Sequence, residues 1–291
     1  MGRDIAEAVP DARAVYAEGS EASGLDLERL CFHAEAEELV DTAVQQPALV
    51  ATSLAILAAI RDRGIEPDFV IGHSVGEFAA LAAAKALSVK DAIALVRERG
   101  IAMAEAAKLH PGSMAAILGL EDEVVETLCR QILGVWPANY NCPGQIVVSG
   151  EDPAVEECCD QAVDEGARRA VKLRVSGAFH SPLVAHAAER LKPAVERIKF
   201  NDPTAPFMST VTAKIEPAHR MAGLLVEQLT APVKFTQAAS ELAKDGVKTF
   251  VEVGPGNVLT GLLRRIDKTA KAIPVNNLAG LAKLEDELAT T

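Results

Sequence analysis

A serine between two glycines is the first feature of this sequence that could do chemistry. Residues 72–76 read Gly-His-Ser-Val-Gly and match G-x-S-x-G, a pattern that places a serine on a sharp turn between a strand and a helix. An apolar run at 67–71 precedes the turn, and an Ala- and Leu-rich stretch follows it. The two glycines would remove side chains that clash there. We therefore predict that Ser74 is a nucleophile and that the N–H of Val75 donates to an oxyanion; the alternative is a chance turn with a capping serine.

A serine nucleophile needs a base, and the sequence offers six histidines. Three of them lie in polar surroundings or beside a predicted domain boundary. His73 flanks the serine and would point away from it, which leaves His180 and His186. From the residues alone, His180 is as readily a structural hydrogen-bonding residue as a base.

Composition excludes several classes of function. The chain has 291 residues and a formal net charge of −12, which argues against nucleic acid as the main partner because phosphate binding needs a basic face. Its five cysteines form no C-x-x-C pair, which indicates reduced thiols in a cytoplasmic protein, with neither a disulfide framework nor a zinc site. We also expect no signal peptide and no apolar run long enough to span a membrane.

Periodicity predicts the elements that must position these residues. Apolar residues at helical spacing predict a helix over 46–64, with Pro47 in its first turn and Gly64 at its C-terminal cap. A second helix is predicted over about 90–107. Near the end of the chain, strands are predicted at 249–253 and 272–275, with a Gly-Pro-Gly turn and a helix between them.

The middle of the chain has a different pattern of predicted strands and helices. It predicts, in order, strand 113–119, helix 122–133, strand 135–139, strand 146–149, helix 153–165 and strand 170–175. This β-α-β-β-α-β order is the ferredoxin-like pattern. The predicted fold class is α/β: residues 1–110 and 178–291 form a hydrolase-like body with a parallel sheet, and residues 111–177 form an inserted ferredoxin-like small subdomain. The active site would lie between them.

Seven short motifs, in order along the chain, carry a resemblance to a known family. They are Q-P-A-L at 46–49, G-H-S-V-G-E at 72–77, R-G at 99–100, N-C-P-G-Q at 141–145, A-F-H-S at 178–181, Gln228, and E-V-G-P-G at 252–256. Together they resemble the malonyl-CoA:acyl-carrier-protein transacylase family, which includes the acyltransferase domains of fatty-acid and polyketide synthases. One such motif would be weak evidence, whereas seven in order are specific.

The resemblance implies a role for each matched residue. Ser74 would attack a thioester and carry the acyl group, and His180 would be its base. A backbone carbonyl near Gln228 would orient the histidine in place of an aspartate. Arg99 would hold the free carboxylate of malonate, for which a planar guanidinium is suited because it makes two parallel hydrogen bonds. Without the resemblance, Arg99 would be read as a solvated helix residue.

The resemblance also implies an acyl pocket, lined by Gln46, His73, Phe179 and Gln228. From the residues alone, the two glutamines would be read as helix surface. Val75 and the pair before His180 are similar to the malonyl-type pattern of the family. A bulky Phe179 would leave less room for an α-methyl branch on the acyl group.

One family segment is not matched. The family opens with a strand and a G-Q-G-S-Q segment, whose glutamine supplies a second oxyanion N–H, whereas residues 1–4 resemble the stretch just after that segment. We expect one of three explanations: a start further upstream, an impaired chain, or another segment in the place of the strand.

The predicted reaction moves malonyl from malonyl-CoA to Ser74 and then to the phosphopantetheine thiol of acyl carrier protein. No metal and no permanently bound cofactor are implied. One alternative is a serine hydrolase or thioesterase, and another is a catalytically impaired module that binds the carrier protein. A basic cluster, Arg168, Arg169, Lys172 and Arg174, is either a docking site for the acidic carrier or a solvated edge.

Overall fold

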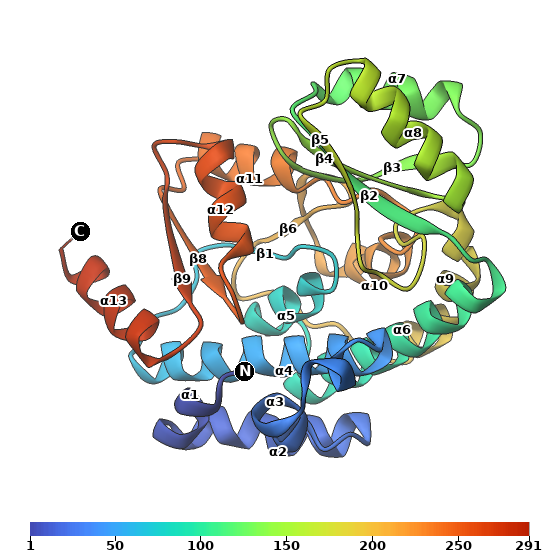
Figure 1. Cartoon of the computed structure of the whole chain (residues 1–291). Helices are drawn as coiled ribbons and strands as arrows, with labels where there is room; N and C mark the ends of the chain where they lie inside the picture. The colour runs from blue at the N-terminus through green and yellow to red at the C-terminus, as the bar shows by residue number, and fades with distance from the viewer. Residues whose placement is uncertain (291) are drawn as a thin grey trace.

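The computed structural model describes residues 1–290, in layers around a central helix (Figure 1). Three N-terminal helices form the lowest layer in this view: α1 (Arg3–Ala8), α2 (Pro10–Ser23) and α3 (Leu27–His33). The central helix α4 (Thr42–Asp62) crosses directly above them. Next to them lie α5 (Gly76–Ala83), α6 (Val89–Leu109) and α9 (Ala185–Glu196). The helix expected over 90–107 is therefore confirmed as α6.

The long apolar helix α4 begins at Thr42, earlier than expected. Asp41 caps it by accepting the N–H of Ala43 at 2.9 Å, so Pro47 does not start the helix but lies inside it. A proline has no N–H to give to the carbonyl four residues before it. Here the carbonyl of Ala43 accepts a hydrogen bond from Nη1 of Arg97 instead, at 2.5 Å.

The expectation that no apolar segment could span a membrane is wrong as a statement about length and composition. Helix α4 meets both criteria, with a mean hydropathy of 1.6. In the fold, 72% of this stretch is buried, against α2, α5 and α6. Its hydropathy is accounted for by its place as the central core helix.

The body holds two small sheets. Strand β1 (Val70–Ile71) pairs in parallel with β6 (Phe207–Ser209), which pairs antiparallel with β7 (Lys214–Glu216). Strand β8 (Thr249–Val253) pairs in parallel with β9 (Lys271–Val275). Strands were predicted at both places, at 249–253 and 272–275. Within residues 1–290 no pairing joins the two sheets, so the single parallel sheet expected for the body is present as two pieces, one with an antiparallel edge.

The middle of the chain folds in the predicted β-α-β-β-α-β order. Its elements are β2 (Ser113–Leu118), α7 (Asp122–Gln131), β3 (Val135–Cys142), β4 (Gln145–Gly150), α8 (Asp152–Asp164) and β5 (Arg169–Lys172). The strands form one antiparallel sheet in the order β3-β4-β2-β5, with its own apolar core beneath α7 and α8. Since β5 ends at Lys172, the strand expected over 170–175 stops short and leaves Arg174 outside it. The domain bounds at 110/111 and 177/178 stay predictions.

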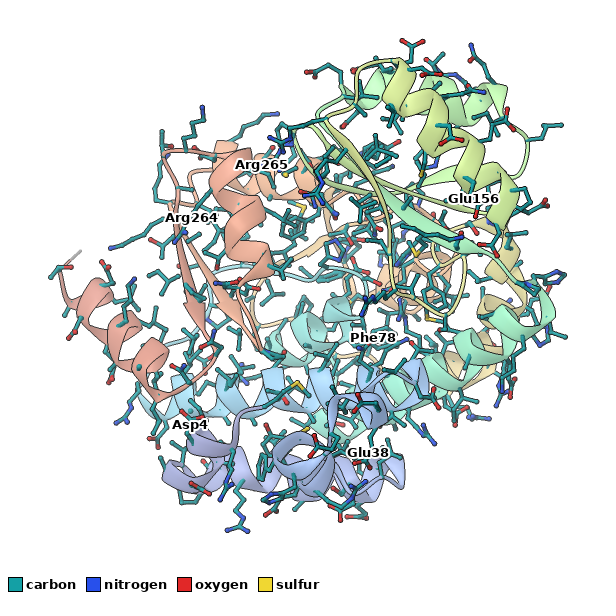
Figure 2. All side chains as sticks on the ribbon, viewed as in Figure 1. Asp4, Glu38, Phe78, Glu156, Arg264 and Arg265 are labelled. Carbon is teal, nitrogen blue, oxygen red and sulfur yellow. The ribbon has the colours of Figure 1, made fainter. Side chains whose placement is uncertain are left out.

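Two contacts attach this small sheet to the body. Val233 pairs with β3: its carbonyl accepts the N–H of Tyr140 at 2.9 Å, and its N–H donates to Ala138 at 2.8 Å. Arg265 of α12 (Val258–Ile266) donates to the carbonyl of Pro143 at 2.7 Å, on the side of α12 that faces the sheet (Figure 2). These contacts hold the C-terminal end of β3 beside the body.

The remaining elements complete the body. They are the short 3-10 helices η1 (Ala36–Leu39) and η2 (Pro182–Val184) and the helices α10 (Ala218–Glu227), α11 (Phe235–Lys244) and α13 (Leu278–Ala289). At the start of α12, buried Glu252 accepts the N–H groups of Leu259 at 3.0 Å and Thr260 at 2.7 Å. The glutamate of the E-V-G-P-G motif is thus a cap for this helix.

Candidate active site

Ser74 lies on a strained turn between β1 and α5. Its φ of 52° is in the left-handed region, which a non-glycine residue rarely adopts. Gly72 allows this turn, because a Cβ there would lie 2.2 Å from the amide nitrogen of Glu77. The same explanation, expected for both glycines, is wrong for Gly76, where a Cβ would meet nothing within 4 Å.

His180 contacts the serine directly. Its Nε2 lies 2.7 Å from Oγ of Ser74, and its Nδ1 lies 2.8 Å from the backbone carbonyl of Gln228. A carbonyl only accepts, so Nδ1 carries the proton and Nε2 is free to accept the serine hydroxyl. Burial, reinforced by the charge of Arg99, lowers the pKa of His180 to about 3. The imidazole is therefore neutral and able to take a proton.

Arg99 is buried and also contacts the serine. Its Nη2 donates to Oγ of Ser74 and to Oε1 of Gln228, both at 3.0 Å, and its Nη1 donates to Oε1 of Gln46 at 2.5 Å. Nε is buried without a hydrogen-bond partner in the described structure. Burial lowers the pKa of Arg99 to about 10, so the guanidinium keeps its charge. The solvated-helix interpretation of this arginine is wrong.

A close helix crossing brings Arg99 and Gln46 together. At Gly100 of α6 a Cβ would lie 2.7 Å from Cα of Ala43 in α4, so any other residue would push the two helices apart. The side chain of Gln46 is held from its other end, since its Nε2 donates to Oγ1 of Thr42 at 2.7 Å. Both glutamines, Gln46 and Gln228, are buried, which excludes the helix-surface interpretation.

Glu77, in the first turn of α5, is part of the site and was not singled out from the sequence. Its Oε2 accepts Nε2 of Gln228 at 2.7 Å, and its Oε1 accepts the N–H of Thr210 at 2.7 Å and the Thr210 hydroxyl at 3.0 Å. It is fully buried, and burial raises its pKa to about 7. The sequence signals were its place at the end of the G-H-S-V-G-E motif and the presence of one acid at the start of an otherwise apolar helix.

His73 is held by the small sheet. Its Nε2 lies 2.9 Å from Oδ1 of Asn141 in β3, and its ring lies 5.4 Å from that of Phe235. Burial lowers the pKa of His73. Asn141 belongs to the N-C-P-G-Q motif, so this motif contributes a contact beside the nucleophile.

Phe179 is buried in the main core immediately before His180. Its ring edge would lie 3.3 Å from a Cβ at Gly177, and that Cβ would also lie 2.6 Å from the Cβ of Ala107. The chain is thus closely packed where it returns to the body. A role for Phe179 in acyl choice stays a prediction, as does the oxyanion role of Val75 at the N-terminal cap of α5.

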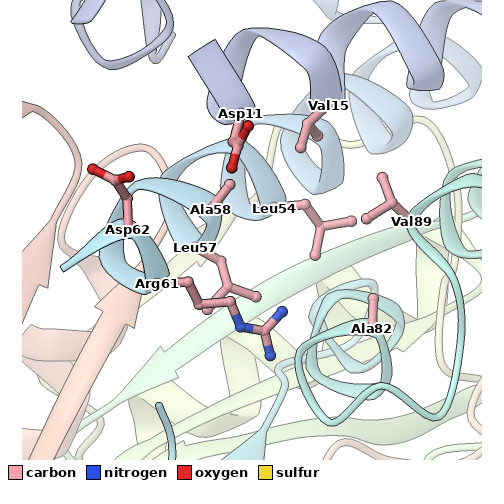
Figure 3. A pocket seen from close by; sticks show the side chains of 9 residues that line it. All are labelled: Asp11, Val15, Leu54, Leu57, Ala58, Arg61, Asp62, Ala82 and Val89. Carbon is pink, nitrogen blue, oxygen red and sulfur yellow. The ribbon is translucent and has the colours of Figure 1, made fainter. Parts of the chain in front are cut away.

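A separate hollow lies between α2, α4, α5 and the start of α6 (Figure 3). Its lining consists of Asp11, Val15, Leu54, Leu57, Ala58, Arg61, Asp62, Ala82 and Val89. None of these residues belongs to the Ser74 network. Across residues 1–290 no group of three His, Cys, Asp or Glu side chains is placed to hold a metal ion.

This constellation of a serine on a strand–helix elbow, a neutral histidine and a buried arginine is suited to acyl transfer. The sequence pattern described as "Acyl transferase domain" matches residues 1–290. The chain therefore belongs to the acyl transferase family, and the resemblance drawn from the seven motifs is confirmed.

Particular relatives are similar over nearly the whole chain. The malonyl CoA-acyl carrier protein transacylase of Bacillus subtilis (strain 168) is 43% identical over 283 residues, covering 95% of this chain and 89% of that protein. The transacylase of the same name from Haemophilus influenzae is 38% identical, covering 99% and 94%.

Solved structures agree with the fold. A malonyl-transacylase in complex with a type II PKS acyl-carrier protein has a TM-score of 0.95 at 39% identity, covering 99% of this chain and 94% of that one. The acyl-carrier-protein-S-malonyltransferase from Bartonella henselae has a TM-score of 0.95 at 38% identity, covering 99% and 95%. The predicted α/β fold class is confirmed.

Proposed function

We propose that this protein is an acyl-carrier-protein S-malonyltransferase, which moves malonyl from malonyl-CoA through Ser74 to the phosphopantetheine thiol of acyl carrier protein. The relatives and structural neighbours named as malonyl transacylases support this assignment. The observation that carries it is the position of Ser74 Oγ, 2.7 Å from Nε2 of His180 and 3.0 Å from Nη2 of Arg99. The oxygen of the proposed nucleophile therefore contacts both the proposed base and the cation proposed to bind the carboxylate.

In the first half-reaction, Oγ of Ser74 attacks the thioester carbon while Nε2 of His180 takes the hydroxyl proton. The carbonyl oxygen becomes an oxyanion, which the N–H of Val75 would stabilise. Val75 is the N-cap of α5, and the N–H groups at the start of a helix have no acceptor within it. The intermediate collapses, the C–S bond breaks, and His180 returns the proton to the coenzyme A thiolate.

The second half-reaction runs these steps in reverse on a new thiol. The phosphopantetheine thiol of acyl carrier protein gives its proton to His180 and attacks the malonyl ester. Ser74 leaves with the proton from His180, and malonyl is now a thioester of the carrier. We propose that no bound cofactor is needed, because serine and histidine supply the nucleophile and the base.

Arg99 distinguishes this reaction from ester hydrolysis. The carboxylate of malonate loses its water on entering the site, and a buried guanidinium offsets that loss. We propose that Gln46 and Gln228, which orient the guanidinium, and Phe179 and His73 border the malonyl group. Free thiols at all five cysteines are consistent with the proposed cytoplasmic location.

Labelled malonyl-CoA without acceptor tests the proposal. The parent should accumulate label on Ser74 and release it to phosphopantetheinylated carrier protein. Ser74→Ala should accumulate none, and His180→Ala should slow labelling by about 10²–10⁴-fold, the range for a general base. Label that passes to water would indicate the hydrolase, and a parent that binds carrier protein without labelling would indicate the impaired module.

A further inference from the structure

Gln228 holds two parts of the site at once. Its backbone carbonyl accepts Nδ1 of His180 at 2.8 Å, and its side-chain oxygen accepts Nη2 of Arg99 at 3.0 Å. The side-chain amide has a second end, Nε2, which donates to Glu77 at 2.7 Å. The orientation of this one amide therefore decides whether an oxygen or an NH₂ group faces the guanidinium.

The groups on either side of the amide allow one orientation only. A guanidinium has only hydrogen-bond donors, so the amide oxygen of Gln228 must face Arg99 and its NH₂ group must face Glu77. The carboxylate itself cannot turn away, because its other oxygen is held by the backbone N–H of Thr210 at 2.7 Å. Glu77 and Gln228 are both buried, so water does not substitute for either contact.

We propose that Glu77 is a positioning residue for substrate selection: through the Gln228 amide it orients Arg99 to receive the carboxylate of the acyl group. Glu77 has no contact with Ser74 or His180 in the hydrogen-bond network, so it acts only through Gln228 and Arg99. Its carboxyl group also lies in the field of Arg99, whose positive charge lowers the pKa of Glu77 against the raising effect of burial. The inference rests on the proposed function, since it concerns which thioester the site prefers.

Glu77→Gln separates orientation from packing, because the two side chains have nearly the same shape. Thr210 donates a backbone N–H, so the new amide must turn its oxygen to Thr210 and its NH₂ group to Gln228. Two NH₂ groups then face each other. Gln228 must rotate, and its NH₂ group then faces Arg99, where a donor meets a donor.

The measurement is kcat/KM of Ser74 acylation with malonyl-CoA and with acetyl-CoA. Glu77→Gln should lower the malonyl value by about ten- to hundredfold, the range for losing a hydrogen bond to a charged group, and lower the acetyl value much less. Thr210→Val is the matched control, because it removes a hydroxyl from the same carboxylate but leaves the backbone N–H and Gln228 in place. It should keep the malonyl-to-acetyl ratio of the parent, and equal losses for both thioesters in Glu77→Gln would overturn the inference.

A double substitution keeps the test decisive if Glu77→Gln folds poorly. In the variant that carries Glu77→Gln and Gln228→Glu, the new amide donates to the new carboxylate, which also accepts from Arg99, so every donor again has an acceptor. This variant should unfold at higher denaturant than Glu77→Gln alone while malonyl loading stays low, because the new carboxylate occupies Arg99. A double variant no more stable than the single one would also overturn the inference.

The unfolding comparison requires no turnover, so it reports the Glu77–Gln228 contact whether or not the chain transfers malonyl. A parent that fails to label Ser74 would instead refute the proposed function, and the two failures are distinguishable.

Discussion

Nη2 of Arg99 lies 3.0 Å from Oγ of Ser74, so the buried cation and the proposed nucleophile share a hydrogen bond. The same guanidinium is held by Gln46 and Gln228, which orient it from two sides. A carboxylate bound to the guanidinium of Arg99 would therefore lie close to Ser74. In the proposed reaction, charge recognition and the chemical step would therefore occur in one place.

Arg99→Ala should invert the preference of the enzyme from malonyl-CoA toward acetyl-CoA. Malonyl transfer should lose about 2–5 kcal/mol, the range for truncating one partner of a buried charge pair. Acetyl has no carboxylate and should lose nothing from this contact. Arg99→Lys should recover part of the malonyl activity, because lysine carries the charge but cannot donate the two parallel hydrogen bonds of a guanidinium. Values of kcat/KM for both thioesters decide the matter, and a uniform loss would make Arg99 a structural residue.

The buried His180 should make stability depend on pH in a defined direction. Its pKa is about 3 in the fold and 6.5 as an ordinary histidine, so below pH 6.5 the unfolded chain binds a proton that the folded chain does not. The stability of the parent relative to His180→Ala should therefore fall by about 1.4 kcal/mol per pH unit as the pH drops from 6.5 toward 3. Above pH 7 the difference should be constant. Denaturant unfolding of both proteins across this range is the measurement, and a difference independent of pH would contradict the shifted pKa.

The two glycines of the elbow should respond differently to alanine. Gly72→Ala places a Cβ 2.2 Å from the amide nitrogen of Glu77, so the turn must open and acylation of Ser74 should be lost. Gly76→Ala places its Cβ in open space in a helix, where alanine is favoured over glycine by about 1 kcal/mol. Stability and labelling measured for this matched pair would show whether backbone clearance at residue 72 forms the elbow; normal labelling in Gly72→Ala would show that it does not.

The basic edge of the small sheet should contribute unequally to carrier docking. Lys172 is paired with Asp152 at 2.9 Å and Glu156 at 3.1 Å, whereas Arg168 and Arg169, which are exposed like Lys172, form no ion pair within the described residues. Reversing the charge of both arginines should raise KM for acyl carrier protein and leave KM for malonyl-CoA unchanged. Lys172→Gln is the control and should change neither value much. An equal rise in both KM values after charge reversal would count against docking.

The local sequence determined the elbow, the order of elements in the small sheet and most helices. These features depend on residues within a few positions of one another: Gly72 clears the turn, and apolar periodicity sets the faces of α6 and α8. Local patterns were less reliable where distant groups intervene. Pro47 was expected to begin a helix, but Arg97 from another helix satisfies the carbonyl that the proline leaves free, and α4 continues through it.

Only the tertiary structure determined which residues of the site contact one another. Ser74 contacts Arg99 and His180 from 25 and 106 positions away, and no spacing rule predicts such contacts. They exist because α5 packs against α6, which carries Arg99, and because the end of α10 holds His180. Matched motifs could name His180, Arg99 and Gln228, yet they could not reveal that the carbonyl of Gln228 fixes the histidine tautomer or that Glu77 fixes the Gln228 amide. The physical reason is burial: once water is excluded, each donor must find an acceptor in the fold, and that pairing exists only in three dimensions.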